Sequence, residues 1–196
     1  MPPKVKITKD QIFNVALNIA RESGYDGVNA REIAKILNCS TQPIFSNYKN
    51  MDEIKKDIVV YSITLYKKYI ENEINEKNYP DYKASGMAYI KFAKEEKELF
   101  KLLFMRNARG DYNDSDMGWQ KSVDMAQKNS GVDKNNSELF HLEMWIVVHG
   151  IATMQATGYM DIDVSLASSI LSDTYNGLKC RFNGGDNGCN KNWRHN

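Results

Sequence analysis

Residues 31 to 48 read Arg-Glu-Ile-Ala-Lys-Ile-Leu-Asn-Cys-Ser-Thr-Gln-Pro-Ile-Phe-Ser-Asn-Tyr, and this stretch decides the fold. Its pattern predicts two short helices joined by a tight turn. Ile33, Ala34 and Leu37 would form one apolar face of the first helix. Asn38 falls at the turn, where a helix end often needs the left-handed backbone that Asn tolerates.

The second short helix is expected to have one buried face and one outward face. Ser40 is placed to cap its start, and Pro43 falls in the first turn, where its missing N–H is not needed. Its apolar face would consist of Ile44, Phe45 and Tyr48. The outward polar residues would be Thr41, Gln42, Ser46 and Asn47. This division suits a helix-turn-helix in the DNA major groove, although an ordinary helical hairpin shares part of the pattern.

Three expected helix starts near the N-terminus carry the same capping pattern, in which Thr or Asn is followed three residues later by Gln or Glu. These pairs are Thr8 with Gln11, Asn29 with Glu32, and Asn50 with Glu53. The pattern predicts a helix from about residue 8 to 23, then the two short helices. A long helix would follow from about residue 50 to 75.

This layout resembles the DNA-binding domain of the TetR family of bacterial transcriptional regulators. The matching elements are Gly24-Tyr25, the helix start from Asn29 to Ala34, and Phe45-Ser46-Asn47-Tyr48. The resemblance covers about residues 5 to 58.

Three positions depart from the family pattern. Phe45 lacks the hydroxyl that often reaches a phosphate in the family. Met51 replaces a Lys that contacts a phosphate, a role for which Lys49 could substitute. Gln42 stands where a Gly is usual, and its amide can pair bidentately with adenine.

The resemblance and the outward pattern together predict a set of DNA-binding residues. These are Lys6, Thr8, Asn29, Arg31, Thr41, Gln42, Pro43, Phe45, Ser46, Asn47, Tyr48 and Lys49. The whole chain has a net charge of +1, whereas residues 1–50 hold seven Lys or Arg and four Asp or Glu, a balance of +3. Lys4, Lys6 and Lys9 form a basic arm. It is either a solvated terminus or an arm that follows phosphates and makes the affinity salt-dependent.

The remaining sequence is helix-compatible and shows no convincing alternating strand pattern, so we expect an all-α fold of about nine helices. An N-terminal three-helix helix-turn-helix domain would cover residues 1–50, and a helical effector-binding and dimerisation domain residues 51–182. Helices are expected at about 82–94, 99–104, 117–128, 137–157 and 164–182, with polar loops at 109–115 and 131–136. The tail at 183–196, with five Asn and three Gly, is expected to be disordered.

No signal peptide or apolar run of about 20 residues is present, so a membrane role is not expected. The three cysteines show no CxxC spacing, which is typical of a reducing compartment. We therefore expect a cytoplasmic protein.

A second resemblance lies near the C-terminus. The segment Trp145-Ile146-Val147-Val148-His149-Gly150 is similar to the Trp-x-x-x-His-Gly signature of one branch of TetR-family C-terminal domains. In that family the last two helices pair with those of a second chain as a four-helix bundle. The resemblance then implies a homodimer with recognition helices about 34–36 Å apart and a palindromic operator on double-stranded DNA. The implied interface residues are Gly150, Ala156, Ala167, Leu171, Thr174 and Leu178; internal packing is the alternative for the small ones.

A set of aromatic and sulfur-containing residues could line an apolar cavity for a small aromatic or lipophilic effector. The candidates are Tyr66, Tyr89, Phe104, Trp119, Met125, Trp145 and His149. His149 or a Tyr would be the polar anchor. Each of them could equally be an ordinary core residue.

Two other classes of protein are weighed against this interpretation. Glu138-x-x-His141 matches half of a di-iron helical site, but a second copy at His149 would need Glu where Ile146 stands. No catalytic residues, metal site or cofactor are therefore expected. A helical protein-interaction adaptor that does not bind DNA is the alternative. We expect a ligand-responsive transcriptional repressor, in which an effector moves the fourth helix and changes the spacing of the recognition helices.

Overall fold

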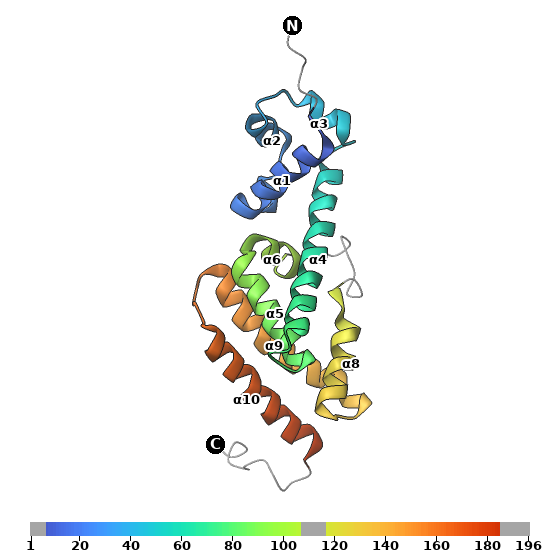
Figure 1. Cartoon of the computed structure of the whole chain (residues 1–196), viewed down its shortest axis with the longest axis vertical. Helices are drawn as coiled ribbons and strands as arrows, with labels where there is room; N and C mark the ends of the chain where they lie inside the picture. The colour runs from blue at the N-terminus through green and yellow to red at the C-terminus, as the bar shows by residue number, and fades with distance from the viewer. Residues whose placement is uncertain (1–6, 107–116, 185–196) are drawn as a thin grey trace. The chain divides into compact units, whose positions relative to one another are not determined.

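The computed structural model describes residues 7–106 and 117–184, which form nine α-helices and one 3-10 turn (Figure 1). No strand occurs in these two ranges, as the predicted all-α fold requires. In chain order the elements are α1 Lys9–Ser23, η1 Tyr25–Gly27, α2 Ala30–Ile36, α3 Gln42–Asn47, α4 Met51–Glu76, α5 Asp81–Glu95, α6 Lys97–Phe104, α8 Trp119–Ser130, α9 Lys134–Thr157 and α10 Val164–Asn183. The predicted loop at 109–115 and most of the predicted tail lie outside the described residues.

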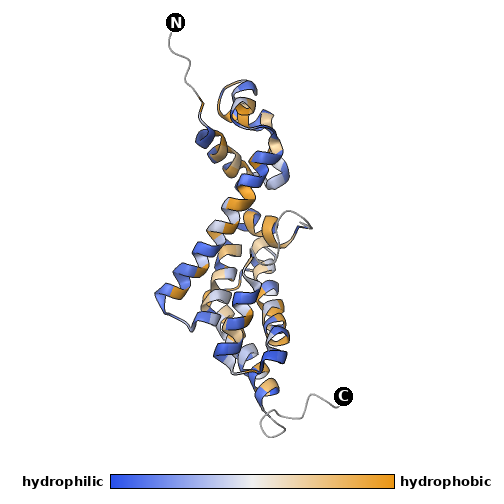
Figure 2. Ribbon diagram, turned by 90° about the vertical axis from the view of Figure 1, so that its right-hand side faces the viewer, coloured by the Kyte–Doolittle hydropathy of each residue, from blue (hydrophilic) through white to orange (hydrophobic). Residues whose placement is uncertain are grey.

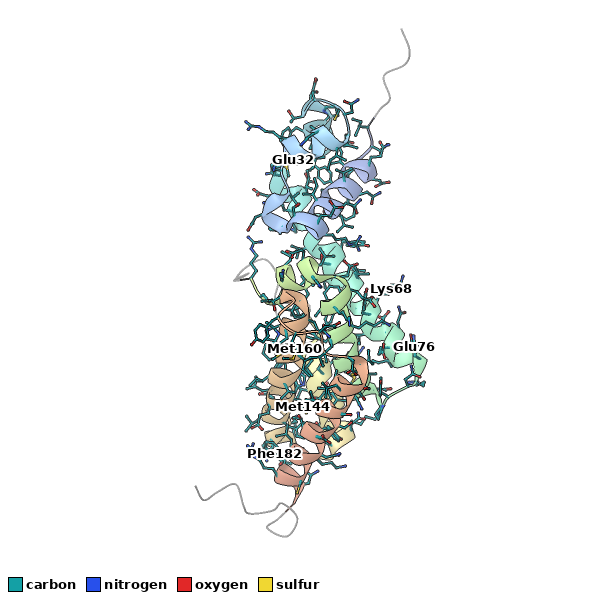
Figure 3. All side chains as sticks on the ribbon, turned by 90° about the vertical axis from the view of Figure 1, so that its left-hand side faces the viewer. Glu32, Lys68, Glu76, Met144, Met160 and Phe182 are labelled. Carbon is teal, nitrogen blue, oxygen red and sulfur yellow. The ribbon has the colours of Figure 1, made fainter. Side chains whose placement is uncertain are left out.

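The helices belong to two compact units. The N-terminal unit comprises the described residues of 1–66 and 96–112, and the C-terminal unit those of 67–95 and 113–196. The chain passes from the first to the second within α4, whose 26 residues amount to about 39 Å at 1.5 Å per residue. The C-terminal end of α4 is hydrophilic in Figure 2, and Lys68 and Glu76 are both exposed there (Figure 3).

The three predicted caps form to different degrees. Thr8 and Gln11 make the complete capping box, in which each side chain accepts a hydrogen bond from the other residue's backbone N–H. Asn29 caps α2 with its side-chain oxygen alone. Before α4, the Asn50 side chain accepts from the Glu53 N–H, but the Glu53 carboxylate accepts from the Lys49 N–H instead of that of Asn50. All three predicted helix starts are therefore stabilised by local hydrogen bonds.

In the N-terminal unit, α1 packs against α2, α3 and α6. Its buried face holds Ile12, Ala16, Ile19 and Ala20, as the periodicity predicts. The Arg21 guanidinium donates two hydrogen bonds, of 2.8 and 2.7 Å, to the Glu96 carboxylate just before α6. The chain leaves α1 through Gly24, whose φ of +77° favours glycine. Sequence periodicity does not predict the Arg21–Glu96 ion pair, which joins α1 to the start of α6.

In the C-terminal unit, α5 and α9 lie side by side, and α8 and α10 pack against both (Figure 1). Gly86 of α5 lies where these helices meet, and a Cβ added there would be in van der Waals contact, at 3.4 Å, with side-chain atoms of Val148 and Leu171. Phe182, labelled in Figure 3, contacts Phe140 with 5.8 Å between ring centroids. The core of this unit is therefore built between α5, α8, α9 and α10.

Tyr82 and His141 form a buried polar pair inside this core. The Tyr82 hydroxyl and His141 Nδ1 are 2.9 Å apart. Burial lowers the pKa of His141 from its ordinary value of 6.5 to about 4 and raises the pKa of Tyr82. Both side chains are therefore neutral near pH 7, and their hydrogen bond satisfies two groups removed from water.

Two sequence-based expectations about compartment can be compared with the structure. None of the helices in the described ranges is both long and apolar enough to span a bilayer. Cys39 is a free, half-buried thiol, whereas Cys180 is disulfide-bonded. Cysteine usage therefore gives no argument about the compartment.

The Arg21–Glu96 pair should stabilise the N-terminal unit. A double-mutant cycle with Arg21→Ala and Glu96→Ala, followed by circular dichroism in urea, should give a coupling energy of about 1–2 kcal/mol, since the pair is bidentate and partly buried. Arg181 and Glu143 form a more exposed pair in the other unit and serve as the matched control, with less than about 1 kcal/mol expected. Equal coupling in the two pairs would contradict the claim.

His141 should make stability depend on pH. Its pKa is lower in the folded state than in the unfolded chain, so its contribution is complete above about pH 6.5 and is lost as pH falls toward 4. Between about pH 7.5 and pH 5 the free energy of unfolding should fall by roughly 2 kcal/mol through this group alone. His141→Gln, which retains an acceptor for Tyr82, should show a shallower decline in urea titrations at the two pH values. The same decline in both proteins would exclude His141 as its source.

Candidate nucleic-acid interface and effector site

The turn between α2 and α3 is a Schellman motif. The Cys39 N–H donates to the Ala34 carbonyl at 2.9 Å, and the Asn38 N–H donates to the Lys35 carbonyl at 3.1 Å. Asn38 has φ +49°, the left-handed conformation predicted for it. The motif satisfies carbonyl groups at the end of α2 and reverses the chain within a few residues.

The start of α3 differs in detail from the prediction. Thr41, and not Ser40, precedes the helix, and no side chain caps it. Gln42 and Pro43 are the first two residues of α3, where the missing proline N–H costs no hydrogen bond. The sequence pattern favours Ser40 as the cap of α3 because Ser is a preferred capping residue, but the turn ends one residue later.

The two faces of α3 follow the prediction at several positions. Ile44 is fully buried, and Gln42 and Ser46 are exposed. The Ser46 hydroxyl donates to the Gln42 carbonyl at 2.9 Å. Phe45, predicted on the apolar face, is instead 48% exposed.

Tyr48, a member of the predicted DNA-binding set, is buried, with only 2% of it exposed. Burial, the negative charge of Asp57 and a hydrogen bond to that carboxylate raise the pKa of its phenol. The Lys9 ammonium lies 4.4 Å from the centre of the Tyr48 ring. Tyr48 therefore anchors the end of α3 in the core of the N-terminal unit.

Three further predicted residues have structural tasks for their polar atoms. The Thr8 hydroxyl and the side-chain Oδ1 of Asn29 accept backbone hydrogen bonds at the starts of α1 and α2. The half-buried Asn47 amide donates to the carbonyls of Ile7 and Pro43, at 3.3 and 2.8 Å. These side chains thus stabilise the local backbone through hydrogen bonds within the chain.

Positive charge on the described part of this surface is modest. Arg31 and Lys49 are exposed, whereas Lys9 lies 3.5 Å from Asp57 and 3.8 Å from Glu53. Thr41 and Pro43 are half-buried. Lys6 and Lys4 of the predicted arm lie outside the described residues. The exposed members of the predicted set are therefore Thr8, Asn29, Arg31, Gln42, Phe45, Ser46 and Lys49.

The predicted effector residues divide between the two units. Tyr66 and Phe104 belong to the N-terminal unit and contact each other edge to face, with 5.2 Å between ring centroids. Tyr89, Trp119, Met125, Trp145 and His149 belong to the C-terminal unit. The predicted residues therefore come from both units.

The group in the C-terminal unit centres on His149 of α9. Its ring stacks on Trp145, with 4.7 Å between centroids and 16° between planes, and its Nδ1 lies 2.9 Å from the Tyr89 hydroxyl. Trp119 of α8 contacts both Trp145 and His141, with centroids 6.2 and 4.5 Å apart. Burial lowers the pKa of His149. An aromatic surface with a neutral imidazole suits a largely apolar molecule that carries one hydrogen-bonding group.

Sequence reasoning missed Thr153, one helical turn after His149. Its hydroxyl oxygen is buried and has no hydrogen-bond partner in the described residues. The spacing of four from His149 was the available signal, since such residues share a helix face. Within residues 7–106 and 117–184, no group of three or more His, Cys, Asp or Glu is arranged to hold a metal ion.

The predicted dimer residues differ in exposure. Ala156, Ala167 and Leu171 are at most 3% exposed in the single chain and pack internally. Thr174 and Leu178 are half-exposed, and a Cβ added at Gly150 would meet no atom within 4 Å. A sequence alone does not distinguish a small residue that permits packing within one chain from a small residue that permits packing between two chains.

An exposed apolar stripe on α9 was not predicted. Leu139, Leu142 and Ile146 are 43, 39 and 56% exposed. Their spacing places them on one face of the helix, and Gly150 continues that face by one turn. Apolar side chains aligned in this way are the better candidates for contact with a partner.

The chain is similar to known proteins in its structure, whereas its sequence has no match among protein families or curated proteins. A protein of unknown function from Rhodococcus sp. RHA1 matches with a TM-score of 0.71 and 16% identity, over 93% of this chain and 99% of that one. A TetR-like transcriptional regulator from the same organism matches with a TM-score of 0.66 and 13% identity, over 94% and 100%.

A putative fatty acid metabolism regulator from Clostridium perfringens matches with a TM-score of 0.60 and 15% identity, over 85% of this chain and 97% of that one. At these identities the likeness concerns the fold. The chain therefore has the fold of the TetR-like regulators, with an N-terminal helix-turn-helix and a helical C-terminal part.

Proposed function

We propose that this chain is a cytoplasmic transcriptional repressor that binds a palindromic operator as a homodimer and releases it when a small apolar molecule binds. The observation that carries the proposal is the geometry of α2, the turn and α3. The Schellman motif fixes the turn, Ile44 is buried, and Gln42 and Ser46 remain exposed. That is the arrangement by which a helix-turn-helix enters the major groove.

The proposed DNA contacts are of two kinds: contacts to phosphates, which position the protein on the duplex, and contacts to base edges, which distinguish sequences. Arg31 and Lys49 are exposed cations suited to phosphate oxygens, and the basic arm with Lys6 would add to them. Gln42 is the residue suited to an adenine edge. Thr8, Asn29 and Asn47 would act by holding the backbone in place, because their side chains bond within the chain.

The proposed dimer uses the exposed face of α9. Leu139, Leu142 and Ile146 offer an apolar stripe, and Gly150 would let a second helix approach closely. Leu178 and Thr174 of α10 are half-exposed and would contribute at the edge. A two-fold axis through such a face would present two recognition helices to successive major grooves.

The proposed effector site is the aromatic group around His149. Tyr89, Trp119 and Trp145 supply the apolar contacts, and the unpartnered hydroxyl of Thr153 supplies a polar one. A lipophilic ligand is also in keeping with the structural match to a regulator named for fatty acid metabolism. An aromatic ligand would use the same stacking surfaces.

The proposed response is a population shift. An effector that binds one arrangement of the C-terminal helices more tightly favours that arrangement, and α4 is continuous between the two units. To move the protein almost completely from the DNA-binding state, the ligand must prefer the other state by about 5 kcal/mol. Smaller preferences would produce partial release.

Selection from a random duplex pool tests the proposed function. We expect a palindrome to be enriched, because a two-fold dimer presents the same α3 to each half-site, and affinity should fall as salt rises. Bound duplexes are sequenced and the mass of the complex is measured alongside. Absence of enrichment at low salt, with protein shown to be free of ligand, would contradict DNA binding and favour the adaptor alternative.

Ile146→Asp should weaken the dimer by placing a charge in the apolar stripe, and the mass in solution should fall to that of one chain. Val60→Asp is the matched control, since Val60 is 54% exposed and Ile146 56%, and it should leave the dimer intact. Sedimentation velocity gives the mass, and circular dichroism verifies that both variants are folded. An unchanged mass for Ile146→Asp would exclude this face of α9 as the interface.

A further inference from the structure

Phe45 is an exposed aromatic residue of α3, and the packing of the core does not account for its exposure. Its neighbours Ile44 and Tyr48 fill the space beneath α3 and are 0% and 2% exposed, whereas Phe45 is 48% exposed. Leaving an aromatic ring in water forgoes the free energy that its burial would provide. A single exposed apolar residue is common on protein surfaces, so exposure alone does not assign a role.

The position of Phe45 on α3 supplies the second observation. Gln42 lies three residues earlier, so the two side chains share one face of the helix, and both are exposed. The polar face of α3 therefore ends in an aromatic ring. A phenyl group has no hydrogen-bond donor for a phosphate oxygen, so the contact it can make is an apolar one.

DNA offers one strongly apolar group in the major groove, the C5-methyl of thymine, which apolar side chains such as Phe contact. Residues three apart on a helix have Cβ atoms about 5–6 Å apart. Successive bases on one strand rise by about 3.4 Å. Gln42 and Phe45 would thus reach base pairs one or two steps apart.

We propose that Phe45 is a specificity-determining residue that reads the methyl group of a thymine in each operator half-site. This inference rests on the proposed DNA-binding function. It adds a preference for an A·T pair at a position where hydrogen bonding would give none. In place of a phosphate contact at this point of α3, the protein makes a base contact.

The test uses the operator obtained by selection, with each thymine of the half-site replaced in turn by 2′-deoxyuridine, which lacks only the methyl group. Dissociation constants are measured for the full-length wild type and for Phe45→Ala. Removing one buried methyl should weaken wild-type binding about four-fold per half-site, or about fifteen-fold when both half-sites are changed. In Phe45→Ala the same replacement should change affinity less than about two-fold, because the partner of the methyl is gone.

Ile36→Ala is the matched control, because Ile36 is an exposed apolar residue of α2 and is 58% exposed. It should retain the full deoxyuridine penalty. Circular dichroism verifies that each variant is folded. The proposal is overturned if no thymine shows the penalty, or if the penalty persists in Phe45→Ala while the operator is still bound. If the wild type binds no duplex at all, the proposed function fails at the earlier step and this inference fails with it.

Discussion

Asn38 holds a left-handed backbone at the point where α2 ends, and the position of α3 depends on this one constraint. With φ at +49°, the N–H groups of Asn38 and Cys39 turn back to the last carbonyls of α2. A residue with a branched side chain would pay a steric penalty there, whereas Asn pays little. The chain can then re-enter a helix within a few residues, with Ile44 and Tyr48 buried and Gln42 and Phe45 exposed.

The two units are stabilised by different kinds of interaction. The N-terminal unit holds the short helix α3 in place with local caps, the buried Tyr48 and the Arg21–Glu96 pair that connects α6 to α1. The C-terminal unit instead buries polar aromatic groups, in which Tyr82 and Tyr89 each pair with a histidine of α9. Such pairs are satisfied when neutral and costly when disturbed, which favours a defined packing around any bound molecule.

Much of the fold could be predicted because its signals are local. Apolar periodicity and capping residues located α1, α4 and α10 to within about a residue, and Asn38 was recognised from its conformational tolerance. The predictions of which side chains are buried were less accurate, because burial depends on tertiary packing. Phe45 and Tyr48 are both aromatic and three residues apart, and only the way α3 packs against its neighbours decides which is buried. Ala167 likewise reads as an interface residue until its internal contacts are known.

The proposed function requires that DNA binds against α3. Amide hydrogen exchange measured with and without a bound duplex tests it most directly, because it reports each backbone segment separately. Residues 41–49 should become protected by the selected operator and much less by a scrambled duplex of the same length. Unchanged exchange in residues 41–49 within a demonstrated complex would contradict the account, since the DNA would then lie on another surface.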